Sequence, residues 1–250
     1  MKSISCKCIT YGRVDTLEEA LYSFLIQEYQ GDSELVIVND YPLQKLHFDH
    51  PRVKIFNLDT TFETIGDKEN FAIENCSYDT IAVWDDDDIA MPNHLNNIDK
   101  YFTDEMDLLQ WHRGVFFNSK QITSICGLGN SGIVYSKKIW KQLGGHAREN
   151  AGYDMTFVMK IKSMSRNVIA ADPPDNEVSW FYYWANRSYH MSGAGTDTSD
   201  RPNVIQRHSE HIERLRQENK IPTGDVYLNP KWAIDYKQLL KDYNDKRIYS

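Results

Sequence analysis

The sequence predicts an α/β protein whose central sheet is mostly parallel and flanked by helices, and three observations support this. Short apolar runs alternate with helical periodicity through the first hundred residues. Polar residues directly follow three of these runs. The composition, 41% hydrophobic and 26% charged over 250 residues, is typical of a globular protein that buries a sizeable core.

The first half supplies four predicted strands and three predicted helices. The strands are short runs rich in β-branched and aromatic residues, at 4–9, 34–38, 53–56 and 80–84. The first helix is expected after Asp15 or Thr16, with Glu18 or Glu19 closing a capping box, and it continues to Leu25. Further helices are expected at 68–75 and 93–102.

The second half is less regular. Strands are expected at 106–111 and 132–135, helices at 137–143, 154–163 and 204–215, and a turn at 173–176. The aromatic run at 180–184 is equally compatible with a buried strand and with a surface that binds sugar rings. The glycine-rich segment 127–132 is interpreted as a backbone turn. No repeat or linker divides the chain, so we expect a single domain.

Composition excludes several classes of protein. No apolar run approaches the roughly 20 residues of a membrane span, and the N-terminus has no secretory signal. The net charge of −8 argues against general nucleic-acid binding, although residues 137–166 are locally basic. The four cysteines have no metal-binding spacing and are expected to be buried thiols in a reducing cytoplasm.

The most informative motif is a run of four aspartates, Asp85 to Asp88, directly after the strand at 80–84. Adjacent carboxylates repel one another, and a divalent cation would relieve that repulsion. Oxygen ligands without a nearby cysteine favour Mg²⁺ or Mn²⁺. A solvated acidic turn is the alternative interpretation. Ligands of parallel sheets bind beyond the carboxyl ends of the strands, where this run lies.

Four segments, taken together, resemble glycosyltransferase family 2, whose members have the GT-A fold, a Rossmann-like fold of nucleotide-diphospho-sugar transferases. The segments are Cys8-Ile9-Thr10-Tyr11-Gly12-Arg13, Val36-Ile37-Val38-Asn39-Asp40, Gly66-Asp67-Lys68-Glu69-Asn70 and Trp84-Asp85-Asp86-Asp87-Asp88-Ile89-x-x-Pro92. The last corresponds to the family's Asp-x-Asp region. In the third, Glu69 stands where the family has arginine, which leaves the phosphate role of that position open.

The resemblance implies a nucleotide-sugar site. Its expected members are Thr10, Tyr11 and Arg13 beside the nucleotide, Asp40 on the base, Lys68 near the diphosphate, Asn70 supporting that loop, and Asp85 and Asp86, the latter near the ribose or sugar. Asp40 precedes Pro42 and could instead be a turn residue. Lys68 could equally be a solvated helix charge.

The resemblance also implies a metal site and a catalytic base. The metal, Mn²⁺ or Mg²⁺, is expected on Asp85, Asp87 and, in the segment Ser188-Tyr189-His190-Met191-Ser192-Gly193, on His190. His190 could instead be a packing residue. Asp154, which follows Gly144-Gly145-His146 and Gly152-Tyr153, matches the position of the family's base. A first-turn acid that only stabilises its helix is the alternative.

The resemblance therefore implies a metal-dependent, inverting glycosyltransferase that uses a nucleoside diphosphate sugar, most simply a UDP-sugar. The expected acceptor is a saccharide or, as a less usual option, a hydroxymethylated DNA base. A nucleotidyltransferase and a non-catalytic sugar- or cation-binding module are the alternatives. Within the single domain, residues 1–105 would bind the nucleotide sugar, 106–230 the acceptor, and 231–250 would form a C-terminal arm.

Overall fold

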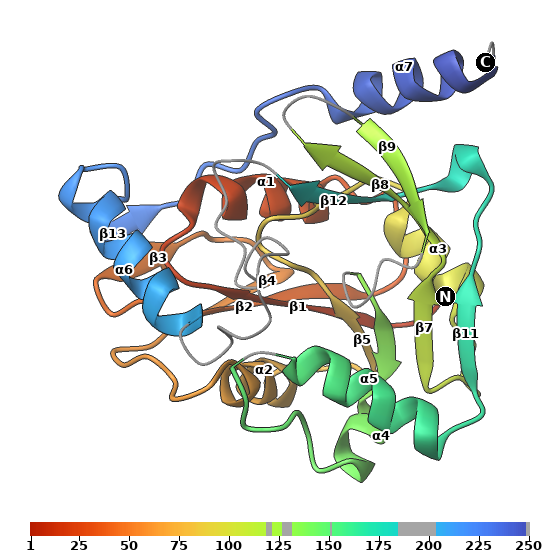
Figure 1. Cartoon of the computed structure of the whole chain (residues 1–250), viewed down its shortest axis with the longest axis horizontal. Coiled ribbons are helices and arrows are strands. Elements are labelled where there is room, and N and C mark those ends of the chain that lie inside the picture. Colours follow the sequence, from red (N-terminus) through yellow and green to blue (C-terminus); the bar gives the residue numbers. More distant parts are fainter. Residues whose placement is uncertain (119–121, 127–131, 151, 185–203, 249–250) are drawn as a thin grey trace.

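The computed structural model describes residues 1–118, 122–126, 132–150, 152–184 and 204–248. Its centre is a seven-stranded sheet in the order β11-β7-β10-β5-β1-β2-β4 (Figure 1). The strands are β1 (Ile4–Thr10), β2 (Ser33–Asn39), β4 (Val53–Asn57), β5 (Thr80–Val83), β7 (Leu108–Trp111), β10 (Val134–Ser136) and β11 (Val168–Ala171). β10 runs antiparallel to both of its neighbours, whereas the other neighbouring pairs are parallel. The predicted mostly parallel α/β architecture is confirmed.

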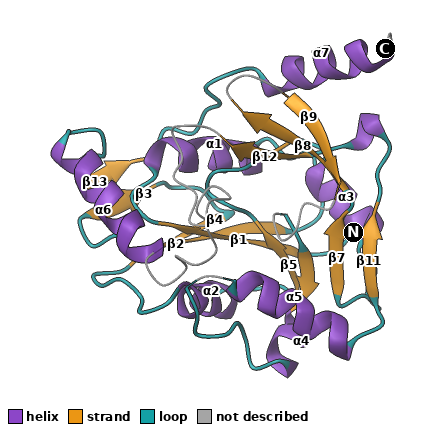
Figure 2. Ribbon diagram, viewed as in Figure 1, coloured by secondary structure: helices purple, strands orange, loops and turns teal. Residues whose placement is uncertain are grey.

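Two apolar clusters cover the two faces of this sheet. On one face lie α2 (Ile65–Glu74), α4 (Lys137–Gln142) and α5 (Tyr153–Met164), which pack against alternate residues of β2 and β5. The other face packs against α1 (Val14–Leu25) and α3 (His94–Tyr101). Figure 2 shows the two helical layers on opposite sides of the strands. The alternation places Cys6 and Cys8 on the α1 side, where both thiols are fully buried, as expected.

Two smaller sheets were not predicted. One has the order β6-β12-β8-β9 and the other pairs β13 with β3. The strands are β3 (Gln44–His47), β6 (Ile89–Ala90), β8 (Arg113–Asn118), β9 (Ile122–Cys126), β12 (Trp180–Trp184) and β13 (Gly224–Tyr227). Most are short, and several pair with segments far away in the sequence. A local sequence pattern cannot predict that short strands pair with segments so distant in the sequence. Trp180 is 2% exposed and packs against Trp84, so the buried-strand interpretation holds for this residue.

The beginnings of two predicted helices need correction. The capping box predicted for α1 is wrong, since the helix begins at Val14 without a side-chain cap. Glu18 instead accepts from the backbone of Asn229, and Glu19 accepts from the Tyr236 hydroxyl, because the C-terminal segment packs on this helix. α2 begins three residues earlier than predicted, with Thr64 as its cap.

The C-terminal segments return to the first half of the chain. They comprise the short helix η1 (Asp175–Glu177), α6 (Val204–Gln217) and α7 (Tyr236–Ile248). Ile212 of α6 packs with Tyr41, which follows β2. The division at residues 105 and 230 stays a prediction. In the described part of the chain, no helix is long and apolar enough to cross a membrane.

Candidate active site

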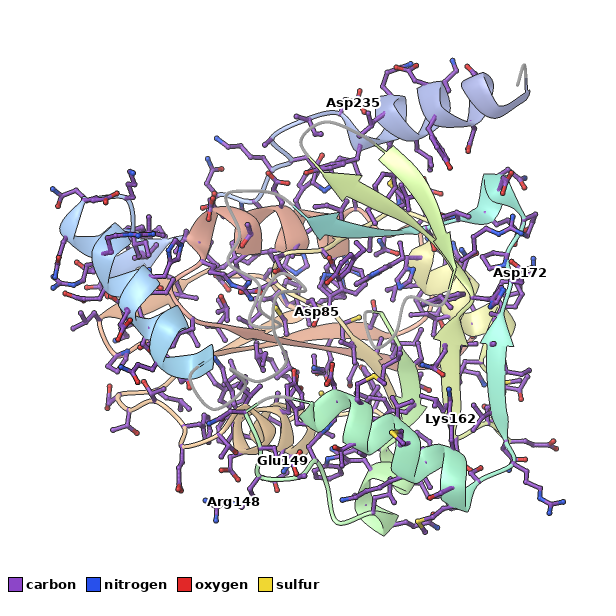
Figure 3. The ribbon with its side chains drawn as sticks, viewed as in Figure 1. Asp85, Arg148, Glu149, Lys162, Asp172 and Asp235 are labelled. Atoms are coloured by element: carbon purple, nitrogen blue, oxygen red, sulfur yellow. The ribbon has the colours of Figure 1, made fainter. Side chains whose placement is uncertain are left out.

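Three neighbouring parallel strands bring the predicted site segments together. β1 pairs with β2 on one side and β5 on the other, with Thr10 opposite Asn39 and Lys7 opposite Val83. The loops that follow therefore leave the same edge of the sheet. Figure 3 labels Asp85, the second residue after the end of β5, near the middle of the molecule. The expected convergence of the nucleotide loop, Asp40 and the aspartate run is confirmed by this register.

Arg13 holds two of the four aspartates. Its guanidinium forms a two-pronged ion pair with Asp86, with 3.1 Å from Nε to Oδ2 and a second contact from Nη2 to Oδ1. Its Nη1 lies 2.8 Å from Oδ2 of Asp87. Burial raises the pKa of Asp86 to about 6 against the lowering effect of Arg13. This charge-assisted fork fixes both carboxylates in place.

Asp85 differs from its neighbours. It is half-buried, and its carboxylate makes no hydrogen bond or ion pair with the residues that the structure describes. Burial, followed by the charges of Asp87, Glu69 and Asp86, raises its pKa to about 7, although Lys7 opposes them. A carboxylate in such surroundings gains from a nearby cation.

The donor chemistry at this edge fits a divalent cation, with Asp85 and Asp87 as oxygen ligands. Among the described residues, no three His, Cys, Asp or Glu side chains are grouped closely enough to enclose one. The predicted third ligand, His190, lies outside the described residues. The metal assignment of Asp85, Asp87 and His190 therefore stays a prediction.

Lys68 joins two of the converging loops. Its Nζ donates to the carbonyl of Thr10 at 2.6 Å and forms an ion pair with Asp40. The other oxygen of Asp40 accepts from the backbone N–H of Phe62 at 3.0 Å. Lys68 is 5% exposed and lies 5.9 Å from the ring of Tyr11. It is thus not a solvated helix charge, while contacts of Lys68, Asp40, Thr10 and Tyr11 with a nucleotide stay predictions.

The next two residues of α2 face the other half of the site. Asn70 accepts from Trp140 Nε1 at 3.0 Å and from the backbone N–H of His146 at 2.7 Å, and it donates to the carbonyl of His146 at 3.0 Å. Glu69 is 1% exposed, forms an ion pair with Lys7, and accepts from the Tyr153 hydroxyl at 3.2 Å. Asn70 therefore holds the loop before α5, and Glu69 makes no contact suited to a phosphate.

Asp154 is the second residue of α5 and is half-buried. The helix is capped by the backbone of Gly152, in the left-handed region at φ 77°, so Asp154 is a first-turn acid rather than the cap. Its Oδ1 accepts from the backbone N–H of Met155 at 2.8 Å. The pKa of Tyr153 is raised by burial and by Glu69, Asp154 and Asp85, so these carboxylates act on one neighbourhood. The role of Asp154 as the catalytic base stays a prediction.

Sequence reasoning missed Lys7 and Tyr153. Lys7 is a charged residue inside the strand Ile4–Thr10 and is 3% exposed. A lysine in a strand that is covered on both faces needs a buried counter-charge, and this was the signal available in the sequence. The unusual glutamate at position 69 supplies that charge.

Comparisons with known proteins agree with this geometry. Residues 7–160 match the family described as Glycosyl transferase family 2. A comparison with curated proteins found no match. The fold is similar to that of Staphylococcus aureus TarS 1–349 in complex with UDP-GlcNAc, at a TM-score of 0.62 and 17% identity over 85% of this chain and 66% of that one.

A second similar structure is the mannosyltransferase PcManGT from Pyrobaculum calidifontis in complex with GDP-Man and Mn²⁺. Its TM-score is 0.57, at 16% identity over 86% of this chain and 69% of that one. The present chain spans only 60% of the length of another TarS 1–349 structure to which its fold is similar. These likenesses show the fold. Because the family match extends over more than half of the sequence, the chain belongs to glycosyl transferase family 2, and its fold is GT-A.

Proposed function

We propose that the protein transfers a hexosyl or pentosyl group from a nucleoside diphosphate sugar to an acceptor hydroxyl, with inversion at the anomeric carbon. The observation that carries this is the meeting of three strand ends, where Arg13 and Lys68 supply positive charge beside the aspartate run. Membership of glycosyl transferase family 2 supports the class of reaction. UDP is our first choice of nucleotide because TarS binds it, and GDP is second because PcManGT binds GDP-Man.

In the proposed reaction, the acceptor oxygen forms a bond to the anomeric carbon while the bond from that carbon to the diphosphate oxygen breaks. The carboxylate of Asp154 takes the proton of the acceptor hydroxyl. Arg13 and Lys68 stabilise the negative diphosphate, and Arg13 keeps Asp86 and Asp87 oriented. A divalent cation on Asp85 and Asp87, with His190 as a further ligand, would neutralise charge on the leaving group.

A saccharide is the acceptor that we favour. A hydroxymethylated DNA base is the other proposal, and activity on duplex DNA that falls steeply with salt would support it.

Thermal unfolding with UDP, GDP, ADP and CDP, each with and without Mn²⁺, tests the donor site. A ligand that binds only the folded state raises the melting temperature. We expect one nucleotide to do so only with Mn²⁺, and Asp87→Ala to abolish the shift. Asp104→Ala, which removes an exposed carboxylate paired with Lys2, should preserve the shift.

Absence of a shift with every nucleotide would contradict the proposal and favour a non-catalytic binding module. Release of pyrophosphate, rather than a nucleoside diphosphate, from the bound substrate would indicate a nucleotidyltransferase instead.

A further inference from the structure

A buried ion pair joins β1 to α2, and its lysine lies opposite Val83, the last residue of β5. Lys7 and Glu69 are 3% and 1% exposed, and the ammonium of Lys7 contacts Oε2 of Glu69. Lys7 also acts on the charge of Asp85. Taking two charges out of water is costly, and apolar residues of similar volume often stabilise a fold at least as well. General stability therefore does not account for this pair.

The second oxygen of Glu69 leads out of the pair toward α5. Oε1 accepts a hydrogen bond from the hydroxyl of Tyr153 at 3.2 Å. Tyr153 is the first residue of α5 and Asp154 the second. One carboxylate thus connects a lysine of β1 with the helical turn that carries the predicted base.

The protonation states fix the direction of this hydrogen bond. Burial tends to raise the pKa of Glu69, but Lys7, His146 and Tyr153 together hold it below its ordinary value. Burial and the nearby carboxylates raise the pKa of Tyr153 well above its ordinary value. Glu69 is therefore an ionised acceptor and Tyr153 a protonated donor at neutral pH.

The start of α5 also has contacts from the ring of Tyr153, which lies edge-on at 5.7 Å from His146, and from Thr156, whose Oγ1 donates to Glu149 Oε2 at 3.5 Å. The helix cap, Gly152, has a left-handed backbone and no side chain, and Asp154 binds only the adjacent amide of Met155 among the described contacts of its side chain. The preceding loop is tied to α2 by two backbone amides, Ile65 to Asn150 Oδ1 at 3.0 Å and Gly66 to the Glu149 carbonyl at 3.1 Å. The hydroxyl of Tyr153 carries this attachment into the first turn of the helix.

We propose that Lys7, Glu69 and Tyr153 form a positioning chain that sets the first turn of α5, and with it the carboxylate of Asp154, relative to the aspartate run. The assignment of Asp154 as a base rests on the proposed function, whereas the positioning chain of Lys7, Glu69 and Tyr153 does not. Glu69, which departs from the family pattern, and Lys7, which interrupts an apolar strand, then explain each other. Neither residue needs to contact the sugar donor.

Tyr153→Phe is the first test, because it removes one hydroxyl and leaves the ring. Hydrogen exchange at residues 153–157 should accelerate about tenfold, as the loss of one buried hydrogen bond predicts, while exchange in β1 and β2 stays unchanged. Release of UDP from UDP-GlcNAc, with water as acceptor, should show kcat reduced about 10- to 100-fold and an unchanged KM. Unchanged exchange at α5 would overturn the proposal.

Tyr29→Phe is the matched control. Tyr29 is 5% exposed, and its hydroxyl donates to the carbonyl of Lys2 at 2.5 Å, away from the site. We expect this variant to lose a comparable hydrogen bond with no change in exchange at α5 or in kcat. An equal fall in kcat in both variants would mean that Tyr153 matters only for general stability, and would overturn the proposal.

A pair of double variants separates the hydrogen bond from the charges. Lys7→Met with Glu69→Gln removes both charges but keeps an acceptor for Tyr153, whereas Lys7→Met with Glu69→Leu removes the acceptor too. We expect at least tenfold higher kcat in the glutamine variant, and no further loss when Tyr153→Phe is added to the leucine variant. Equal kcat in the two would contradict a role through Tyr153.

The two proposals fail in different ways. If the wild-type protein releases no nucleoside diphosphate from any donor, the proposed function fails, and the exchange data still decide whether the positioning chain exists. If turnover is normal but Tyr153→Phe changes neither exchange nor kcat, the positioning chain alone is wrong.

Discussion

At the scale of single residues, Asp85 shows how a site can be built at the expense of stability. Its carboxylate has a pKa of about 7, chiefly because it is half-buried beside other carboxylates. The unfolded chain releases the same proton at about pH 4. Since the folded state holds this proton more tightly, stability falls as pH rises from about 4 to 7 and stays reduced above that range.

Replacing Asp85 with asparagine should therefore stabilise the protein where the carboxylate is charged. We expect Asp85→Asn to raise the melting temperature at pH 8 by several degrees, at about 2–4 °C for each kcal/mol, with little effect at pH 4. Thermal unfolding across this pH range checks it. Asp172→Asn is the control: Asp172 lies at the edge of the molecule in Figure 3, is exposed and pairs with Arg113 at 3.1 Å, so its replacement should not raise the melting temperature at pH 8. A lower melting temperature for Asp85→Asn at pH 8 would contradict the argument.

Single residues also show what the sequence could not predict. The aspartate run could be read directly from the sequence, and its position at the edge of the sheet could be predicted because it comes just after an apolar strand. That Arg13 would bind Asp86 and Asp87 could not, because the partners are more than seventy positions apart. Lys7 could be recognised in the sequence as an unusual charge inside an apolar strand, but only the structure shows that Glu69 is its counter-charge.

At the scale of elements, α2 is the piece that joins the two halves of the site. Lys68 faces the loops after β1 and β2, and Asn70 faces the loop before α5. The helix can come this close because Gly66 has no side chain. A Cβ there would lie 1.8 Å from the carbonyl oxygen of Ala147, which is backbone and cannot rotate away.

Gly66→Ala should consequently push α2 and the loop at 146–150 apart. We expect a loss of about 1–3 kcal/mol in the free energy of unfolding, with faster hydrogen exchange at residues 146–154. Gly224→Ala is the control, because Gly224 has φ 79° but no atom within 4 Å of an added Cβ. Backbone strain alone should leave exchange near α5 unchanged. If Gly66→Ala left hydrogen exchange at residues 146–154 as in the wild type, the close approach of α2 to Ala147 would not be needed to hold this loop, and the argument would be wrong.

At the scale of the whole molecule, local patterns predicted the helices that cover the central sheet and all of its strands except β11, because most of these elements show a local period of apolar residues. They failed for the two smaller sheets. β13 pairs with β3, whose residues lie 180 positions earlier, and both strands are only four residues long. They also failed for the start of α1, because Glu18 and Glu19, the acids predicted to close a capping box, bind the C-terminal segment instead.

The return of the chain to its own beginning places α6 on the predicted nucleotide loop. Ile212 is 1% exposed, and its Cγ2 lies 2.9 Å from where a Cβ on Gly12 would be. It packs in one cluster with Tyr41, against which Tyr11 lies. The shape of the loop that we expect to bind the nucleotide therefore depends on a helix two hundred residues later in the sequence.

Ile212→Ala should weaken nucleotide binding without removing any group that would touch the nucleotide. The cavity is expected to cost about 2–5 kcal/mol of stability and to let the loop at 10–13 relax, so that the Kd for UDP with Mn²⁺ rises severalfold. Leu228→Ala, a buried leucine next to β13 outside this cluster, matches the loss of volume. Calorimetric titration of both variants with UDP and Mn²⁺ decides the point. An equal change in Kd in the two variants would assign the effect to overall stability. A change confined to Ile212→Ala would assign it to the packing of α6 against the loop at 10–13.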